Sequence, residues 1–89
     1  MKLVVTIVGK DRVGIIAMVS AILAEHHVNI LNINQNIIDG FFNMVMIAEM
    51  SDSTIPLPEL QRILSEKGKE INLEIKAQHQ DIFNVMHKI

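Results

Sequence analysis

The strongest constraint on the fold is a change of residue pattern between residues 3 and 16. A run of apolar, mostly β-branched residues ends at Gly9, and the charged triplet Lys10-Asp11-Arg12 follows. β-Branched residues favour a strand, whereas Val13-Gly14 opens a segment whose apolar residues recur at helical spacing. The stretch therefore predicts a strand, a glycine-bounded turn and a helix N-terminus. Any small molecule that the protein binds is expected here.

The remaining segments are bounded by turn-forming residues. Asp39-Gly40 is a strong signal for a two-residue hairpin, so the segments on either side are expected to pair as antiparallel strands. Pro56 and Pro58 favour the start of a second helix, and Gly68 is interpreted as its C-terminal stop. The predicted strands are 2–8, 28–38, 41–50 and 70–78, and the predicted helices are 13–26, 58–67 and a short amphipathic C-terminal helix over 79–89.

This order predicts an α+β sandwich of the ferredoxin-like type, βαββαβ, with a four-stranded antiparallel sheet, two helices on one face and a short C-terminal helix. Right-handed crossovers place both main helices on the same side of the sheet. The other side is then bare. We expect it to need a cover, because one row on the third strand is apolar throughout, namely Phe42, Met44, Met46, Ala48 and Met50. The two candidate covers are the C-terminal helix and a second subunit.

Composition narrows the functional classes. The 89 residues leave room for one domain. A net charge of −2 and only three aromatic residues argue against nucleic-acid binding, which needs a basic face or stacking platforms. No apolar run approaches the ~20 residues of a membrane span. The absence of cysteine is compatible with any compartment but gives no reason to invoke secretion, so we expect a cytoplasmic protein. A hydrophobic content of 49% suggests apolar surface for a partner, and a second copy is the simplest one.

The two strand-to-helix connections differ, so the second serves as a control for the first. The first contains Gly9 and Gly14, whereas 51–58 has no glycine, so this topology does not itself require one. The glycines therefore serve either tight packing or a ligand. A helix N-terminus presents N–H groups that favour anions, so a carboxylate would suit residues 13–16. The alternative is that Asp11 caps the helix and Gly14 permits close contact between helix and strand.

Asparagine is unusually dense in the segment 28–38. It is a poor strand residue, so Asn29, Asn32, Asn34 and Asn36 require a local reason. A side-chain amide offers donors and an acceptor, which suit both the ammonium and the carboxylate of an amino acid. Asn29 and Asn32 are therefore candidate ligand contacts. The alternative is a solvated edge strand, because edge strands carry such residues.

In this order and spacing, the motifs resemble the ACT domain, the small ligand-sensing module of amino-acid metabolism. ACT domains typically show D-x-x-G-[IL] between the first strand and the first helix, here Asp11-Arg12-Val13-Gly14-Ile15, and N-I at the start of the second strand, here Asn29-Ile30. The resemblance covers 1–78 as an ACT-like domain, with 79–89 as a C-terminal helical extension of the same domain. That extension is similar to the ending of short stand-alone bacterial ACT-domain proteins of uncharacterised function.

The resemblance implies a homodimeric regulatory module that binds a small molecule, in particular an amino acid, without catalysis. It implies side-by-side dimers in which second strands or first helices meet, with ligand between the first loop of one subunit and the second strand of the other. We expect no attached enzyme or DNA-binding domain, which leaves open what the module regulates, and an unidentified enzyme or regulator is a candidate partner. The implied ligand-binding residues are Lys10, Asp11, Val13, Gly14 and Ile15 on one chain and Asn29, Ile30 and Asn32 on the partner.

Other functional classes were weighed against this one. A protein–protein interaction module without a small ligand would use the apolar sheet face and the C-terminal helix. Acylphosphatase-like enzymes share the topology, but the first loop lacks the glycines of a phosphate cradle. The four histidines include His26 and His27, which on a helix point about 100° apart, and no known zinc spacing occurs. We expect no cofactor and no metal.

Overall fold

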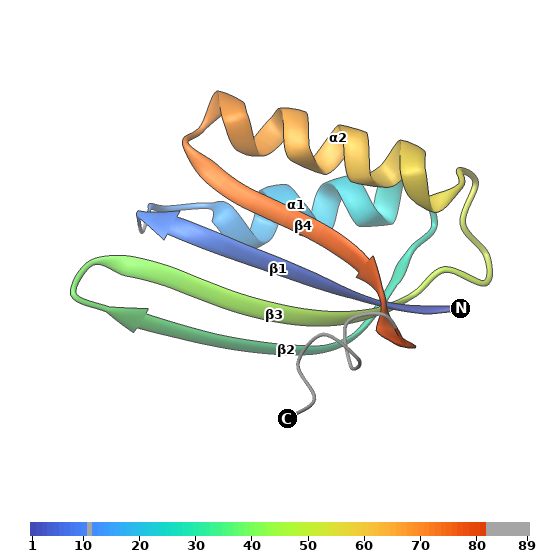
Figure 1. The fold of residues 1–89 in the computed structure, drawn as a ribbon, viewed down its shortest axis with the longest axis horizontal. Coiled ribbons are helices and arrows are strands. Elements are labelled where there is room, and N and C mark those ends of the chain that lie inside the picture. Colours follow the sequence, from blue (N-terminus) through green and yellow to red (C-terminus); the bar gives the residue numbers. More distant parts are fainter. Residues whose placement is uncertain (11, 82–89) are drawn as a thin grey trace.

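The computed structural model describes residues 1–10 and 12–81. Strands and helices follow one another in the order βαββαβ, which confirms the predicted topology (Figure 1). Most of the predicted C-terminal helix, residues 82–89, lies outside the described residues. The elements are β1 (Lys2–Lys10), α1 (Ile15–Glu25), β2 (Asn29–Ile38), β3 (Phe41–Glu49), α2 (Leu57–Glu70) and β4 (Leu73–His79).

The sheet is antiparallel throughout and has the strand order β2-β3-β1-β4. β1 lies inside the sheet, in agreement with its apolar sequence, and β2 and β4 are the two edges (Figure 1). The β2–β3 hairpin turns at Asp39 and Gly40, whose φ angles of 51° and 80° have the sign that a two-residue hairpin requires. The ferredoxin-like α+β class is therefore confirmed.

The core lies between the sheet and the two helices. In each helix the buried residues recur every four positions, so that one stripe faces the sheet. Fully burying one Leu or Ile side chain stabilises a fold by ~1.5–3 kcal/mol relative to exposure. The residues of this core include Leu3, Val5 and Ile7 of β1, Ile15, Val19 and Leu23 of α1, Leu60 and Leu64 of α2, and Leu73, Ile75 and Ala77 of β4.

The apolar row on β3 does not face the bare side of the sheet, and that expectation was wrong. Met44 and Met46 are buried in the core beneath the helices, and Phe42 and Ala48 lie in the same row. The reason is the pairing of β3 with β1, because Val5 lies opposite Met46 and shares its side of the sheet. The methionines therefore fill the interior. We call the other side of the sheet, which carries no helix, the open face.

Both helices end at a non-glycine residue with positive φ. After α1, His27 has a φ of 59°, its N–H donates to the carbonyl of Ala24, and Val28 N–H donates to Leu23 O at 2.9 Å. This pair of bonds is a Schellman motif. After α2, Asn72 has a φ of 58°. The prediction that Gly68 ends the second helix was therefore wrong.

Gly68 lies within α2 because the helix approaches β4 closely at this point. A Cβ atom at position 68 would lie 2.5 Å from the carbonyl oxygen of Leu73 and 3.2 Å from Ile75 Cγ1. The glycine is buried. It therefore permits close packing of helix on strand.

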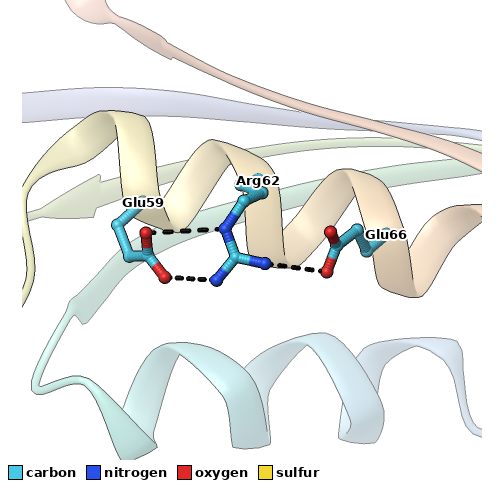
Figure 2. Close-up of polar contacts among 3 residues, drawn as sticks. All are labelled: Glu59, Arg62 and Glu66. Carbon is cyan, nitrogen blue, oxygen red and sulfur yellow. Dashed lines mark hydrogen bonds and ion pairs between the residues drawn. The ribbon is translucent and has the colours of Figure 1, made fainter.

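The solvent side of α2 carries a three-residue ion network, shown in Figure 2. Arg62 donates through Nη1 to Glu66 at 2.9 Å and also pairs with Glu59, one turn earlier. The hydrogen bond from Arg62 lowers the pKa of Glu59, and the bonds to Glu59 and Glu66 raise the pKa of Arg62. These i, i+3 and i, i+4 pairs support a helix whose mean composition is polar.

Within residues 1–10 and 12–81, neither helix is long and apolar enough to cross a membrane.

Candidate functional site

The connection from β1 to α1 presents an apolar side chain to solvent. Val13 is 99% exposed, and Lys10 and Arg12 are also exposed. Asp11, a predicted site residue and a predicted cap, lies outside the described residues. Helix α1 begins at Ile15, two residues later than predicted, because Gly14 has a left-handed φ of 87° and acts as the N-cap position.

Gly14 and Gly9 have different physical roles. A Cβ atom at position 14 would meet nothing within 4 Å, so this glycine is required by its positive φ and not by packing. The alternative that Gly14 permits close contact between helix and strand was therefore wrong. That role belongs to Gly9, which lies within β1, because a Cβ atom there would collide with Leu73 Cδ2 and lie 3.1 Å from Asn72 O.

The N-terminus of α1 is electrostatically open. Among the residues that the structure describes, no side chain caps it, and its first turn has no acidic residue. The first hydrogen bond of the helix runs from Met18 N to Gly14 O, so the N–H groups of residues 15–17 precede the ladder. Helix α2 differs, since prolines remove donors at its start and Glu59 lies in its first turn. Of the two helices that the structure describes, α1 therefore has the N-terminus that favours an anion.

A hollow of about 200 Å³ lies at this N-terminus. A smaller one of about 60 Å³ adjoins it and shares Arg12, Gly14 and Ile15. The side chain of Ile15 is buried in the core, so its contribution to a ligand site is its main chain. The larger of these two hollows is lined by Arg12, Gly14, Ile15, Ile16, Ala17 and Phe42.

Sequence reasoning missed Phe42 as a lining residue. The register places Phe42 opposite Gly9. Phe42 therefore lies beside the end of β1 that leads into the loop. The only signal in the sequence was the hairpin at Asp39-Gly40, which fixes where β3 begins. Arg12, also missed, lies inside the D-x-x-G motif.

The other predicted residues, Asn29, Ile30 and Asn32, lie at the far end of the sheet. Asn29 pairs with Glu49, which pairs with Lys2, whereas Lys10 is level with Phe41 and Ile38. The eight steps from Lys2 to Lys10 span about 27 Å at the usual rise of a strand. Figure 1 shows the start of α1 at one end of the sheet and the start of β2 at the other. One subunit therefore does not bring the two groups together.

A β-bulge determines which way the asparagines face. The register shifts between Ile30 and Asn32, so Leu31 has no partner on β3. As a result all four asparagines of β2, Asn29, Asn32, Asn34 and Asn36, share the open face, whereas Ile30, Ile33 and Ile37 share the side of the helices. A period of two without the bulge would have divided the asparagines between both faces. Ile30 thus lies on the side of the loop hollow, and Asn29 and Asn32 lie on the other side.

The two edges of the sheet are protected unequally. At the β4 edge, Gln61 Nε2 donates to the carbonyl of Ala77 at 2.7 Å, and Leu73 O faces Gly68 of α2. β2 has exposed apolar residues, Ile33 (41%) and Ile37 (57%), and every β2 residue after Ile30 is exposed. An unprotected edge of this length is a template for another strand.

A larger hollow of about 510 Å³ follows the β4 edge beside α2 and contains none of the predicted site residues. Its lining includes Glu74 and Lys76, which pair with each other at 2.9 Å. It lies at the opposite end of α2 from the helix N-terminus, so it lacks the oriented N–H groups found at α1. The exposed N–H groups therefore favour the hollow of about 200 Å³ at the start of α1 as the candidate ligand site.

The sequence profile of the ACT domain matches residues 1–78. The chain belongs to the ACT domain family. The ACT domain is in general a regulatory module that binds small molecules, and such domains commonly dimerise.

Relatives of full length support this assignment. The UPF0237 protein of Clostridium perfringens is 52% identical over 89 residues, covering all of both chains. Among solved structures, the ACT domain protein from Streptococcus pneumoniae has a TM-score of 0.81 and 36% identity over 93% of each chain. A formyltetrahydrofolate deformylase from Pseudomonas syringae has a TM-score of 0.79, but only 27% of that chain is covered, at 23% identity. That likeness shows the fold alone.

Proposed function

We propose that this ACT domain is a homodimeric regulatory module that binds an amino acid and has no catalytic activity of its own. The observation that carries the proposal is the separation of the two predicted residue groups. The N-terminus of α1, which no described side chain caps, lies at one end of the sheet, and Asn29, Ile30 and Asn32 lie at the other. A two-fold axis that pairs two β2 strands antiparallel brings opposite ends together. The site is then shared between subunits.

The unprotected β2 edge supports this dimer. Two β2 strands that pair antiparallel extend the sheet and satisfy the edge N–H and C=O groups. Each strand also presents Ile33 and Ile37 on the side of the helices. The partner's Ile30 then lies near Ile37, which is the β3 neighbour of Phe42 in the hollow.

The ligand chemistry follows from the groups present. The carboxylate of an amino acid binds the N–H groups of residues 15–17, and Arg12 and Lys10 add positive charge at the same end. Gly14 holds the main chain in the conformation that exposes these groups, with Val13 beside it. Asp11 supplies the opposite charge for the ammonium. The partner's Ile30 packs against the ligand's carbon skeleton, and the partner's Asn29 and Asn32, whose side chains face the open side of the sheet, contribute main-chain groups at the strand edge.

Regulation follows from the shared site. A ligand that contacts both subunits binds the dimer better than the monomer, so it shifts the population towards the dimer. A separate enzyme or regulator that recognises the dimer then responds to the amino acid. The expected compartment for such a module is the cytoplasm.

A thermal-shift screen of the full chain against the twenty amino acids tests the proposal. A ligand at 100 times its Kd adds ~2.7 kcal/mol to the free energy of unfolding. Ile30→Ala is expected to reduce the shift strongly, because the partner's apolar contact on the same side of the sheet as the hollow is lost. Asn34→Ala is the control, since Asn34 lies on the same strand but its side chain faces the open side of the sheet, away from the hollow.

A flat screen would contradict amino-acid binding. It would favour the second candidate, a protein–protein interaction module without a small ligand. The observation behind that candidate is the exposed apolar pair Ile38 and Phe41 at the hairpin. A monomeric sedimentation profile at micromolar concentration would contradict the shared site.

A further inference from the structure

The open face of the sheet has an apolar centre and polar margins. β1 and β3 contribute Val4, Thr6 and Val8 and, across from them, Ile47 and Val45. We call these five residues the central stripe. On one side β2 borders it with Asn32, Asn34 and Asn36, and on the other side β4 borders it with Gln78, Lys76 and Glu74.

The dimensions of the central stripe match one α-helix. Two adjacent strands are about 4.8 Å apart, so a stripe of this width suits a helix of about 10 Å diameter. From Val4 to Val8 the strand rises about 14 Å, and a helix of eight to ten residues is about 12–15 Å long. A second sheet would instead bury the asparagine row and the charges of Glu74 and Lys76, which is costly without partners.

The described chain leaves the sheet beside one end of this stripe and starts a helix there. His79, the last residue of β4, pairs with Leu3, the neighbour of Val4. Gln80 and Asp81 have helical backbone geometry, and the N–H of Asp81 donates to His79 Nδ1 at 3.1 Å. That contact places an acceptor side chain at a helix start, as an N-cap does. The carboxylate of Asp81 also favours the first turn.

Exposure along β1 falls towards the same end. Val4 is 2% exposed and Val8 is 46% exposed, although both lie on the open face. Val4 is absent from the core cluster beneath the helices. The Val4 side chain is therefore buried on the open face and not beneath the helices.

The residues that follow have the apolar pattern of a docking helix. In the sequence of 82–89, Ile82, Met86 and Ile89 recur at i, i+4 and i+7, with Phe83 beside them, whereas Asn84, His87 and Lys88 fall on the other side. We propose that residues 82–89 dock as a helix on the central stripe of their own subunit, running from Val4 towards Val8. The open face is then an internal interface of one chain and is not the dimer contact.

Thiol labelling of the full chain tests this docking. Because the protein has no cysteine, Thr6→Cys introduces a single thiol in the middle of the stripe. Adding Phe83→Asp or Met86→Asp is expected to speed its reaction with a maleimide roughly tenfold, because the helix no longer protects it. Asn84→Asp is the matched control, with the same charge on the other face of the helix, and should leave the rate unchanged. A single thiol at Ala21→Cys, which is exposed on α1, is the second control, and its labelling rate should be the same with and without the Asp substitutions.

A cross-linking arm identifies which subunit supplies the helix. In Thr6→Cys/Met86→Cys, a bismaleimide is expected to join the two thiols within one chain. A mixture of Thr6→Cys chains with Met86→Cys chains should give no cross-linked pair. Labelling rates that ignore Phe83→Asp and Met86→Asp would overturn the docking, and cross-links between chains in the mixture would overturn its assignment to the same subunit.

Discussion

Gly9, Gly14 and Gly68 lie in three different environments, and the sequence alone does not distinguish them. Gly9 and Gly68 bring main chain close to Leu73 from two sides, at β1 and at α2. Gly14 faces open space and is present for its positive φ. A substitution at Gly9 or Gly68 therefore tests close packing, whereas a substitution at Gly14 tests the need for a positive φ.

Gly68→Ala is expected to destabilise the protein although it lies in a helix. Helix propensity alone favours alanine by ~1 kcal/mol. The new methyl group would lie 2.5 Å from the main-chain oxygen of Leu73, which cannot move without shifting β4. We expect a net loss of ~1–3 kcal/mol in the free energy of unfolding, measured with urea. Lys69→Ala, exposed in the next position, is the control and should change stability little. A more stable Gly68→Ala protein would show that β4 yields at this contact.

Glu49 is expected to make the stability of the fold sensitive to acid. The N-terminal ammonium at 2.7 Å and Ser51 Oγ at 2.9 Å donate to its carboxylate and lower its pKa from 4.5 to about 2. Because the pKa of Glu49 is lower in the folded protein, the ionised carboxylate stabilises the fold above pH 4.5. This stabilisation is lost as the pH falls towards 2. In urea unfolding, the free energy of unfolding of Glu49→Gln should therefore fall less across this pH interval than that of the parent protein. Glu25→Gln, which removes the same charge elsewhere, should keep the parent's slope; equal slopes for all three would contradict the role of Glu49.

At the scale of elements, the two edge strands have opposite roles. β4 is closed by the contact of Gln61 with Ala77 and by the packing of α2. β2 is long, bulged and exposed, and its two faces differ, with asparagine on one and isoleucine on the other. The proposed dimer contact therefore belongs to β2, whereas β4 is protected within the subunit.

Ile33→Lys is expected to convert the dimer to a monomer, because a lysine on an edge strand opposes pairing with a second strand. Sedimentation velocity at micromolar concentration measures the change. The fold should survive, since Ile33 is 41% exposed and lies outside the core. Glu74→Lys on the β4 edge is the control and should leave the dimer intact. A dimer that persists in Ile33→Lys would place the subunit contact elsewhere.

For the whole molecule, the main consequence of the topology is that one end of the sheet holds the N-terminus of α1 and the other holds the start of β2. In the dimer that we propose, neither end forms the site alone, and a two-fold axis at β2 would give two equivalent sites, each with groups from both subunits. In the two proposals the C-terminal segment occupies the open face and the subunits meet at β2, so dimer contact and internal docking would use different surfaces.

Much of this could be predicted from the sequence, because local patterns depend on neighbouring residues. The element order, the hairpin at Asp39-Gly40, the interior position of β1 and the ACT resemblance all follow from periods and short motifs. The end of α2 could not be predicted, because Asn72 and not Gly68 adopts the left-handed conformation. The choice between them depends on how closely the helix approaches Leu73, which is a contact between separate elements.

The face of each β2 residue and the surroundings of Gly14 were likewise decided only in three dimensions. A single unpaired residue, Leu31, reverses the alternation, and no local pattern marks it. The space around Gly14 depends on what the rest of the chain leaves empty. Residue patterns determine which segments form strands and helices, since that choice is local. The register, the edges and the hollow arise only when distant segments pack against one another.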